Sequence, residues 1–205
     1  MPKGSPERTA ARKEEIINAC EKLYQTMSFK DITLKEIGNE TSFSRPTIYN
    51  YYQTKEEIFL ALFEREYVRW NDELQIILRD NRKLTKTELA EKLAASLANR
   101  QQLLKLLAMN NYDMEGNSRP ELLNSFKVAY GESIKNVCSI LTKFCPKKSD
   151  QEIQNIIYIF FPFMFGIYPY TAVTDKQKKA MKDAKVDFVY QSVFEITNNC
   201  LLKLL

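Results

Sequence analysis

The sequence contains no histidine, and this absence limits the chemistry that its 205 residues can perform. A Ser–His or Cys–His catalytic pair is excluded, and the four cysteines are too widely spaced to match a metal-binding motif. Neither a glycine-rich phosphate loop nor a convergent pair of carboxylates is visible. The sequence therefore predicts neither an enzyme nor a bound metal or cofactor.

The cysteines also bear on the cellular compartment. Cys20, Cys138, Cys145 and Cys200 lie in segments of helical periodicity, which is typical of buried free thiols in a reducing cytoplasm. A redox-sensing thiol at Cys138 or Cys145 is the alternative, although two helical turns separate these residues and prevent a mutual disulfide. The N-terminus lacks the apolar core of a signal peptide, so we expect a cytoplasmic protein.

Glycine and proline are scarce, with 5 and 7 residues, and alternating β-type runs are absent. The fold class predicted is therefore all-α. The most apolar run, residues 153–168, is shorter than the roughly 20 apolar residues that span a bilayer, so no membrane partner is expected. Apolar periodicity and capping residues predict long helices at residues 9–27, 55–79, 118–144, 150–168 and 184–204.

Residues 33–59 have the pattern of two short helices around a tight turn. Thr33 is a good N-cap with Glu36 three residues later, as in a capping box. Ser44 begins a second helix, expected over residues 44–52, and Pro46 lies in its first turn, where the missing N–H costs nothing. Such a pair buries little surface alone and must pack on the helix that precedes it. The sequence therefore predicts a three-helix helix-turn-helix.

The second helix of this pair exposes groups that suit duplex DNA. From Thr41 to Lys55 the segment carries two cations and no acid. Guanidinium and amide groups can reach base edges in the major groove, while hydroxyl groups can reach phosphates. Charges balance over residues 1–58, so any affinity for DNA must come from their placement. A small helical hairpin with aromatic packing is the alternative.

Three ungapped segments carry a family resemblance: TLKEIG at residues 33–38, FSRPTIYNYY at 43–52 and TKEEI at 54–58. They resemble the DNA-binding signature of the TetR/AcrR family of bacterial repressors. The resemblance implies a helix-turn-helix DNA-binding domain at residues 1–54. It also implies a helical effector-binding and dimerisation domain at residues 55–205.

The resemblance implies roles for individual residues as well. Residues 45–47 would face the major groove, Tyr49 and Lys55 would hold phosphates, and Thr33 would cap the first motif helix. The full DNA-binding set expected is Thr33, Ser44, Arg45, Pro46, Thr47, Tyr49, Asn50, Tyr51 and Lys55.

The sequence departs from the family pattern at two places. Gly38 stands where alanine is usual, which costs up to about 1 kcal/mol of helix stability. Thr41 and Ser42 replace the usual Ala-Gly of the turn, and a non-glycine residue in a left-handed turn position costs about 1–2 kcal/mol. We expect packing of Phe43 to offset this cost.

The helix at residues 150–168 is apolar on nearly all sides and therefore needs partners on more than one side. In the family that the chain resembles, the last two long helices pair with their copies in a two-fold four-helix bundle. A homodimer would also place two recognition helices about 34–36 Å apart. The interface residues expected are Ile157, Phe161, Phe165, Val189, Val193, Ile196 and Cys200. Simple core packing of both helices is the alternative.

Aromatic and methionine side chains recur through the middle of the chain and predict an apolar ligand pocket. The candidates are Phe63, Tyr67, Trp70, Met109, Tyr112, Phe126, Tyr130, Phe160, Phe163, Met164 and Tyr168. An aromatic stripe that belongs to the core is the alternative for each of them. The hypothesis is thus a homodimeric repressor that a small hydrophobic or aromatic effector releases from operator DNA. The rival is an all-α carrier of apolar molecules that binds no DNA.

Overall fold

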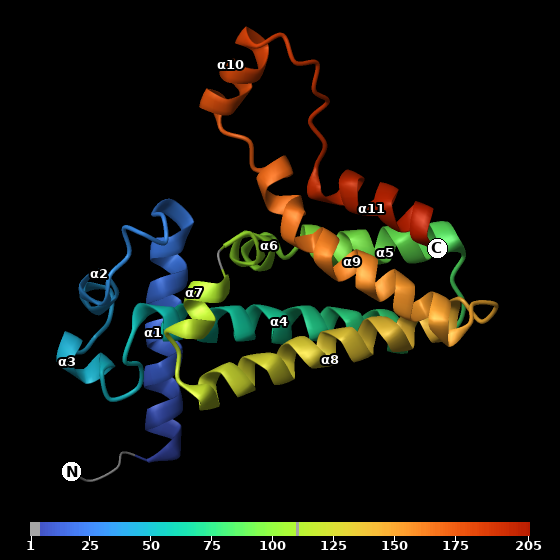
Figure 1. Ribbon diagram of the computed structural model, residues 1–205. Coiled ribbons are helices and arrows are strands. Elements are labelled where there is room, and N and C mark those ends of the chain that lie inside the picture. The colour runs from blue at the N-terminus through green and yellow to red at the C-terminus, as the bar shows by residue number, and fades with distance from the viewer. Residues whose placement is uncertain (1–4, 110) are drawn as a thin grey trace. The chain divides into compact units, whose positions relative to one another are not determined.

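A computed structural model describes residues 5–109 and 111–205, and the side chains of residues 111–113 lie outside that description. All regular elements in the described residues are helices, which confirms the all-α prediction (Figure 1). In chain order they are α1 (Pro6–Thr26), α2 (Leu34–Asn39), α3 (Arg45–Ile48), α4 (Lys55–Asp80), α5 (Lys86–Ala98), α6 (Gln101–Leu107), α7 (Asn111–Gly116), α8 (Pro120–Phe144), α9 (Asp150–Thr171), α10 (Asp175–Asp183) and α11 (Val193–Leu204).

The chain divides into two compact units. Unit 1 comprises residues 1–65 and 110–128, and unit 2 comprises residues 66–109 and 129–205. Helices α4 and α8 each begin in unit 1 and continue into unit 2. The sequence analysis predicts a domain boundary at residue 54, between α3 and α4. That boundary stays a prediction, because the two compact units divide the chain within α4 and α8.

Unit 1 is built around the buried stripe of α1. Helix α2 contacts both α1 and α3, and Ile16, Ile37 and Ile48, one from each of these helices, are fully buried. The ring of Phe59 in α4 meets the ring of Tyr24 in α1 edge-on, with centroids 5.1 Å apart. The N-terminus of α4 begins after Thr54, whose hydroxyl accepts from the backbone N–H of Glu57 at 3.1 Å. Aromatic and aliphatic burial therefore fixes the scaffold that carries α3.

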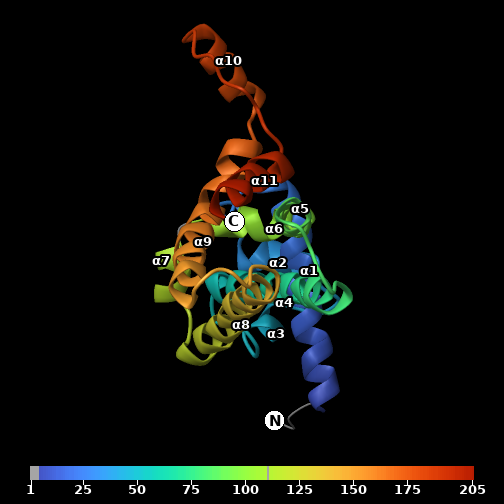
Figure 2. The same ribbon diagram turned by 90° about the vertical axis from the view of Figure 1, so that its right-hand side faces the viewer.

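Unit 2 has an aromatic core. Trp70 of α4 is fully buried and donates its indole N–H to the hydroxyl of Ser96 in α5 at 3.0 Å. The ring of Phe161 in α9 packs 6.0 Å from that of Trp70. Helix α11 contacts both α5 and α9, and α6 contacts α9 (Figure 2). Within the described residues no single helix is long and apolar enough to cross a bilayer, although α9 and α10 pass the same length and composition test together across a bend of 83°.

The last helix is shorter than the sequence analysis predicts. The predicted helix at residues 184–204 is wrong in its first part, because α10 ends at Asp183 and α11 begins at Val193. Lys185 adopts a left-handed conformation with φ of 56°, which interrupts helical geometry. Of the residues that follow, 186–190, all but Asp187 are valine or aromatic, which are residue types that favour extended backbone. Ser192 then caps α11, since its hydroxyl accepts from the N–H of Glu195 at 3.2 Å.

Candidate nucleic-acid interface

Helices α2 and α3 form the short helical pair that the sequence predicts. The hydroxyl of Thr33 accepts from the backbone N–H groups of Lys35 and Glu36, at 3.2 and 3.4 Å, and so caps α2 as expected. Helix α3 is shorter than predicted, because α-helical geometry ends at Ile48 and residues 49–51 continue as turns. Ile48 and Tyr52 are both buried. These two anchors hold one side of α3 against unit 1 and leave its other side exposed.

The turn between α2 and α3 contains no left-handed residue, because Lys185 is the one non-glycine residue with positive φ in the described part of the chain. The expected cost of Thr41 and Ser42 in a left-handed position therefore does not arise. The hydroxyl of Thr41 instead lies 2.9 Å from the carbonyl of Gly38 and 3.0 Å from that of Phe43. Side-chain hydrogen bonds thus stabilise this turn.

Gly38 lies at a close contact between α2 and α3. A Cβ at this position would lie 3.3 Å from the Cβ and 3.4 Å from the Cα of Arg45. These distances are shorter than ordinary van der Waals contacts, so α3 would have to move slightly to accept alanine. The glycine that breaks the family pattern therefore permits a tight crossing at the base of Arg45.

The exposed side of α3 presents polar groups. Ser44, Arg45, Pro46 and Asn50 are exposed, and the exposed fraction of Tyr49 is 47%. The guanidinium of Arg45 donates to the hydroxyl of Tyr49 at 3.1 Å and lies 5.9 Å from the centroid of its ring. The two side chains therefore form one unit on the surface, as the i and i+4 positions of a helical turn allow. Thr47 and Tyr51, the remaining members of this segment, are half-buried.

Lys55, predicted to hold a phosphate, is engaged with the protein. Its ammonium donates to the backbone carbonyls of Phe29 and Ile32, at 2.7 and 3.0 Å, and lies 4.3 Å from the ring centroid of Phe29. A lysine has three donor directions, so these bonds leave one of them for another acceptor. The phosphate contact of Lys55 stays a prediction, whereas its bonds to the loop after α1 are a structural role.

Sequence reasoning missed an ion pair that contacts the turn after α3. Glu57 is 1% exposed, and its carboxylate accepts from the Nε of Arg119 at 2.7 Å and from the backbone N–H of Gln53 at 2.6 Å. Burial opposes ionisation of this carboxyl, but the hydrogen bonds from Arg119 and Gln53 outweigh it and lower the pKa of Glu57. The partners lie 62 residues apart in sequence, so no local pattern signals the pair.

The predicted pocket residues fall into two groups. In unit 2, Tyr67, Trp70, Phe160 and Met164 are buried, and the half-buried members are Met109, Tyr130, Phe163 and Tyr168. In unit 1, Phe63 and Phe126 are buried and contact each other, with ring centroids 4.9 Å apart. The side chain of Tyr112 lies outside the described residues. Several of these residues pack as core, and the pocket itself stays a prediction.

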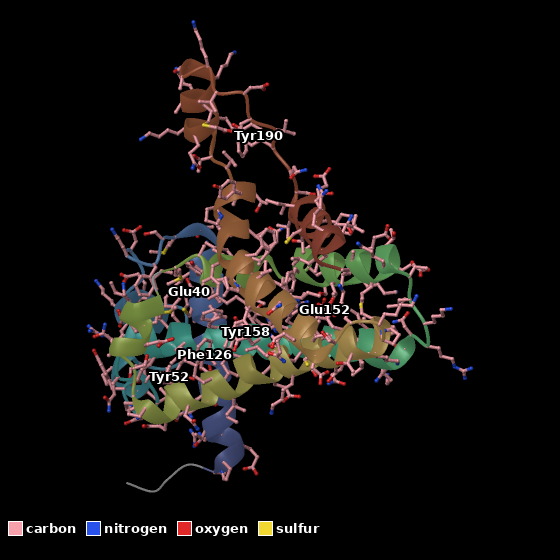
Figure 3. All side chains as sticks on the ribbon, turned by 45° about the vertical axis from the view of Figure 1, so that its right-hand side comes forward. Glu40, Tyr52, Phe126, Glu152, Tyr158 and Tyr190 are labelled. Carbon is pink, nitrogen blue, oxygen red and sulfur yellow. The ribbon has the colours of Figure 1, made fainter. Side chains whose placement is uncertain are left out.

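The predicted dimer residues do not share one surface. Ile157 and Phe161 of α9 are 4% exposed, Val193 is also buried, and Ile196 and Cys200 are half-buried. The exposed members are Phe165 and Val189. The outer face of α9 instead carries Tyr158, which is 76% exposed (Figure 3), and Ile159. In a helix that is apolar on all sides, periodicity cannot decide which side faces the core.

Comparisons with known proteins agree with this arrangement of helices. The model of the family "Bacterial regulatory proteins, tetR family" matches residues 16–62, and that of the "Tetracyclin repressor-like, C-terminal domain" matches residues 64–191. A curated relative, the uncharacterized HTH-type transcriptional regulator YfiR of Bacillus subtilis (strain 168), is 32% identical over 63 residues. That match spans 31% of this chain and 31% of the length of the relative.

Solved structures with a similar fold include three regulators named FadR. The one from Bacillus subtilis, in complex with stearoyl-CoA, is 17% identical, with a TM-score of 0.61 and coverage of 93% of this chain and 96% of that one. The fatty acid degradation regulator from Bacillus halodurans is 15% identical, with a TM-score of 0.59 and coverage of 98% and 96%. The TetR-family repressor from Thermus thermophilus, in complex with lauroyl-CoA, is 19% identical, with a TM-score of 0.54 and coverage of 88% and 97%.

At these identities the structural likeness concerns the fold alone. The sequence models carry the assignment, since the C-terminal model alone matches residues 64–191, more than half of the chain. The N-terminal model covers α2, α3 and the start of α4, where the exposed side of α3 lies. The chain therefore belongs to the TetR family of bacterial transcriptional regulators.

Proposed function

We propose that this protein is a homodimeric repressor that acts in the cytoplasm and leaves its operator when a small effector binds in its helical body. The observation that carries the DNA-binding part is the exposed side of α3. Arg45 and Tyr49 project from a segment whose other side is fixed by buried Ile48 and Tyr52. An arginine beside hydroxyl groups, on a supported helix within a segment (residues 41–55) that carries no acid, suits contacts to bases and phosphates.

The effector that we propose is an apolar molecule with a long or flat hydrophobic part. Its site would involve the aromatic and methionine side chains of unit 2, of which Tyr130, Phe163 and Tyr168 are half-buried and thus adjustable. Two proteins of similar fold are described in complex with stearoyl-CoA and lauroyl-CoA, so long-chain acyl thioesters are the first probes to try. The mechanism would be a shift between two states, only one of which fits the operator.

The proposal is tested by selecting bound duplexes from a randomised DNA library with the purified protein and measuring their affinity by fluorescence anisotropy. The double variant of Arg45→Ala with Tyr49→Phe should lose binding while its circular dichroism and melting temperature stay unchanged. Arg79→Ala, which removes an exposed arginine of α4, is the matched control and should bind normally. The rival carrier function predicts that no duplex is selected. It also predicts stabilisation by acyl-CoA in a thermal-shift assay.

A further inference from the structure

Arg119 stands immediately before α8 and reaches the segment that follows α3. Its Nη2 donates to the backbone carbonyl of Tyr51 at 2.8 Å and to the carboxylate of Glu57 at 3.1 Å. Its Nε donates to the same carboxylate at 2.7 Å, and its backbone N–H does so at 3.1 Å. One arginine therefore joins the end of the recognition turn, which we define as residues 49–54, to the first turn of α4.

Two neighbouring contacts strengthen this junction. The carboxylate of Glu57 accepts from the backbone N–H of Gln53 at 2.6 Å. The hydroxyl of Thr54 donates to the backbone carbonyl of Asn117 at 3.0 Å. Residues 117–119 thus hold the recognition turn directly at Tyr51 and Thr54, and at Gln53 through Glu57, although they lie far from it in sequence and outside the matched DNA-binding model at residues 16–62.

The junction matters because α3 is too short to hold its own orientation and depends on the contacts around it. The helix spans four residues, Arg45–Ile48, and an isolated helix of this length has no stability of its own. Buried Ile48 and Tyr52 fix its depth in unit 1. The hydrogen bond from Arg119 to the carbonyl of Tyr51 fixes the path of the backbone between these anchors and α4.

We infer that Arg119 is a positioning residue for DNA recognition: it sets the orientation of α3 without contacting DNA, and it makes operator affinity depend on the segment that starts α8. The inference rests on the proposed DNA-binding function. Pro120 begins α8 at the next residue, and α8 continues into unit 2. A shift of the start of α8 would therefore move the guanidinium that binds the carbonyl of Tyr51. Binding of the proposed effector could thus change the position of α3 through this arginine.

The planar fork of arginine is essential to this role. Its Nε and Nη2 bind the carboxylate of Glu57 while Nη2 also reaches the carbonyl of Tyr51. A lysine ammonium is a point donor at the end of a flexible stem and cannot span both acceptors in the same way. Arg119→Lys therefore keeps the charge beside Glu57 and removes the geometry that orients the turn.

Arg65→Lys provides a matched control in the same unit. Arg65 is mostly buried and its guanidinium bonds Glu14, Asn18 and Glu21 of α1, at 2.6, 2.6 and 2.7 Å. The substitution removes a comparable set of bonds but none of these partners lies in the recognition turn. It should lower the melting temperature as much as Arg119→Lys does while leaving the recognition turn in place.

The first measurement needs no DNA. Hydrogen exchange of the backbone amides of residues 49–56, followed by mass spectrometry, should be at least about tenfold faster in Arg119→Lys than in the wild type, and unchanged in Arg65→Lys. Equal exchange in all three proteins would overturn the inference whatever the protein binds. Should Arg119→Lys fail to fold, Glu57→Gln, which keeps the shape of the side chain, is measured in its place.

The second measurement uses the duplex that the wild-type protein selects from a randomised library. At a temperature where all variants are folded, Arg119→Lys should bind about tenfold more weakly, with an unchanged slope of log affinity against log salt concentration. The salt slope is also measured for Arg119→Gln, which removes the charge: an unchanged slope is expected, and a slope smaller by about one would mean a direct phosphate contact and would refute the positioning role. An equal loss in Arg65→Lys would do the same by reducing the effect to stability. If the wild type selects no duplex, the proposed function fails while the exchange result still stands.

Discussion

The exposed side of α3 and the outer face of α9 both present large side chains to solvent, but they are built in opposite ways. Helix α3 spans four residues, and its exposed Arg45 and Tyr49 are already paired with each other by a hydrogen bond. Helix α9 spans 22 residues and exposes Tyr158 and Ile159 without a lysine or arginine in its sequence. A surface of oriented hydrogen-bonding groups suits a polar partner. A surface of large, mostly apolar side chains suits a partner that removes these side chains from water.

The two surfaces should therefore lose their proposed partners through different kinds of substitution. The proposed recognition of DNA by α3 would depend on the direction of a few donors, so truncating one side chain or loosening its support should be enough to impair it. Association through α9 would depend on apolar area, so truncations should have small effects and a buried charge a large one.

The largest effect is expected from a charge on the outer face of α9. Tyr158→Glu should convert the proposed homodimer into a monomer, because the carboxylate would have to be buried without a partner. DNA affinity should then fall by about a hundredfold or more, since the two half-sites would no longer be bound together. Light scattering coupled to gel filtration checks the first result and anisotropy checks the second.

The control for that variant is Ile76→Glu, which places the same charge at an apolar side chain of α4 that is 48% exposed. It should leave both the mass and the DNA affinity unchanged. If Tyr158→Glu remains a dimer at micromolar concentration, the outer face of α9 is not the interface, and its exposed side chains have no role in association.

The next largest effect concerns base recognition by α3. Arg45→Ala should weaken binding to the selected duplex by about 1–3 kcal/mol and remove the preference for guanine at one position, because arginine donates to the O6 and N7 atoms of guanine in the major groove. Replacing that guanine by 7-deazaguanine, which lacks N7, should weaken the wild type and leave Arg45→Ala unaffected.

Tyr49→Phe refines this prediction. It removes the hydroxyl that accepts from Arg45 but keeps the ring under the guanidinium. Its loss of affinity should be smaller than that of Arg45→Ala and confined to the same base pair. A uniform weakening on all duplexes by Arg45→Ala would instead assign the arginine to phosphate binding.

A smaller effect is expected in the support of α3 as the pH falls. The folded-state pKa of Glu57 is lowered by its hydrogen bonds from Arg119 and Gln53, which outweigh its burial. The stability that ionised Glu57 contributes is therefore fully present above its unfolded pKa of about 4.3 and is lost as the pH falls through the folded pKa.

Thermal melts of the wild type and of Glu57→Gln test this sign. The difference between their melting temperatures should be constant from about pH 7 to pH 5 and should shrink below about pH 4. Other carboxyls with lowered pKa, such as those of Glu88 and Glu152, are common to both proteins and cancel in the difference. A difference that grows on acidification would contradict the role assigned to the ion pair.

The smallest effect is expected in the support of α11. Ser192→Ala removes the hydroxyl that accepts from the N–H of Glu195 and should cost about 1 kcal/mol, or about 2–4 °C in melting temperature. Ser139→Ala, at an exposed position inside α8, should not destabilise the protein. An equal melting temperature for Ser192→Ala and the wild type would show that packing alone sets the start of α11.

Much of the fold follows from local chemistry that can be read in the sequence. The N-cap at Thr33, the capping box at Ser149 and the N-cap at Thr54 place the starts of α2, α9 and α4, because a cap is decided by residues two to four positions apart. The capping box at Ser192 is equally local. It was missed because Val186, Val189 and Tyr190 extend the hydrophobic pattern upstream of Ser192 and hide the extended segment.

What the sequence could not supply depends on distant partners or on rotation about a helix axis. Arg119 and Glu57 are brought together by the fold, and no local sequence pattern around either residue predicts that they pair. The side of α9 that faces the core is set by packing against α6 and α11, so Phe161 is buried while Tyr158 is exposed. The type of residue on α3 was predictable, whereas the pairing of Arg45 with Tyr49 required the backbone of α3.

Gly38 has a consequence for how operator preference can change. Because a methyl group at position 38 would lie 3.3 Å from the Cβ of Arg45, the size of this side chain limits how closely α2 and α3 approach at Arg45. A larger side chain at position 38 would displace the start of α3 by a few tenths of an ångström without altering any exposed side chain of that helix. In the proposed complex with DNA, position 38 would thus set how deeply α3 enters the groove, whereas Arg45 and Tyr49 would set which bases it contacts.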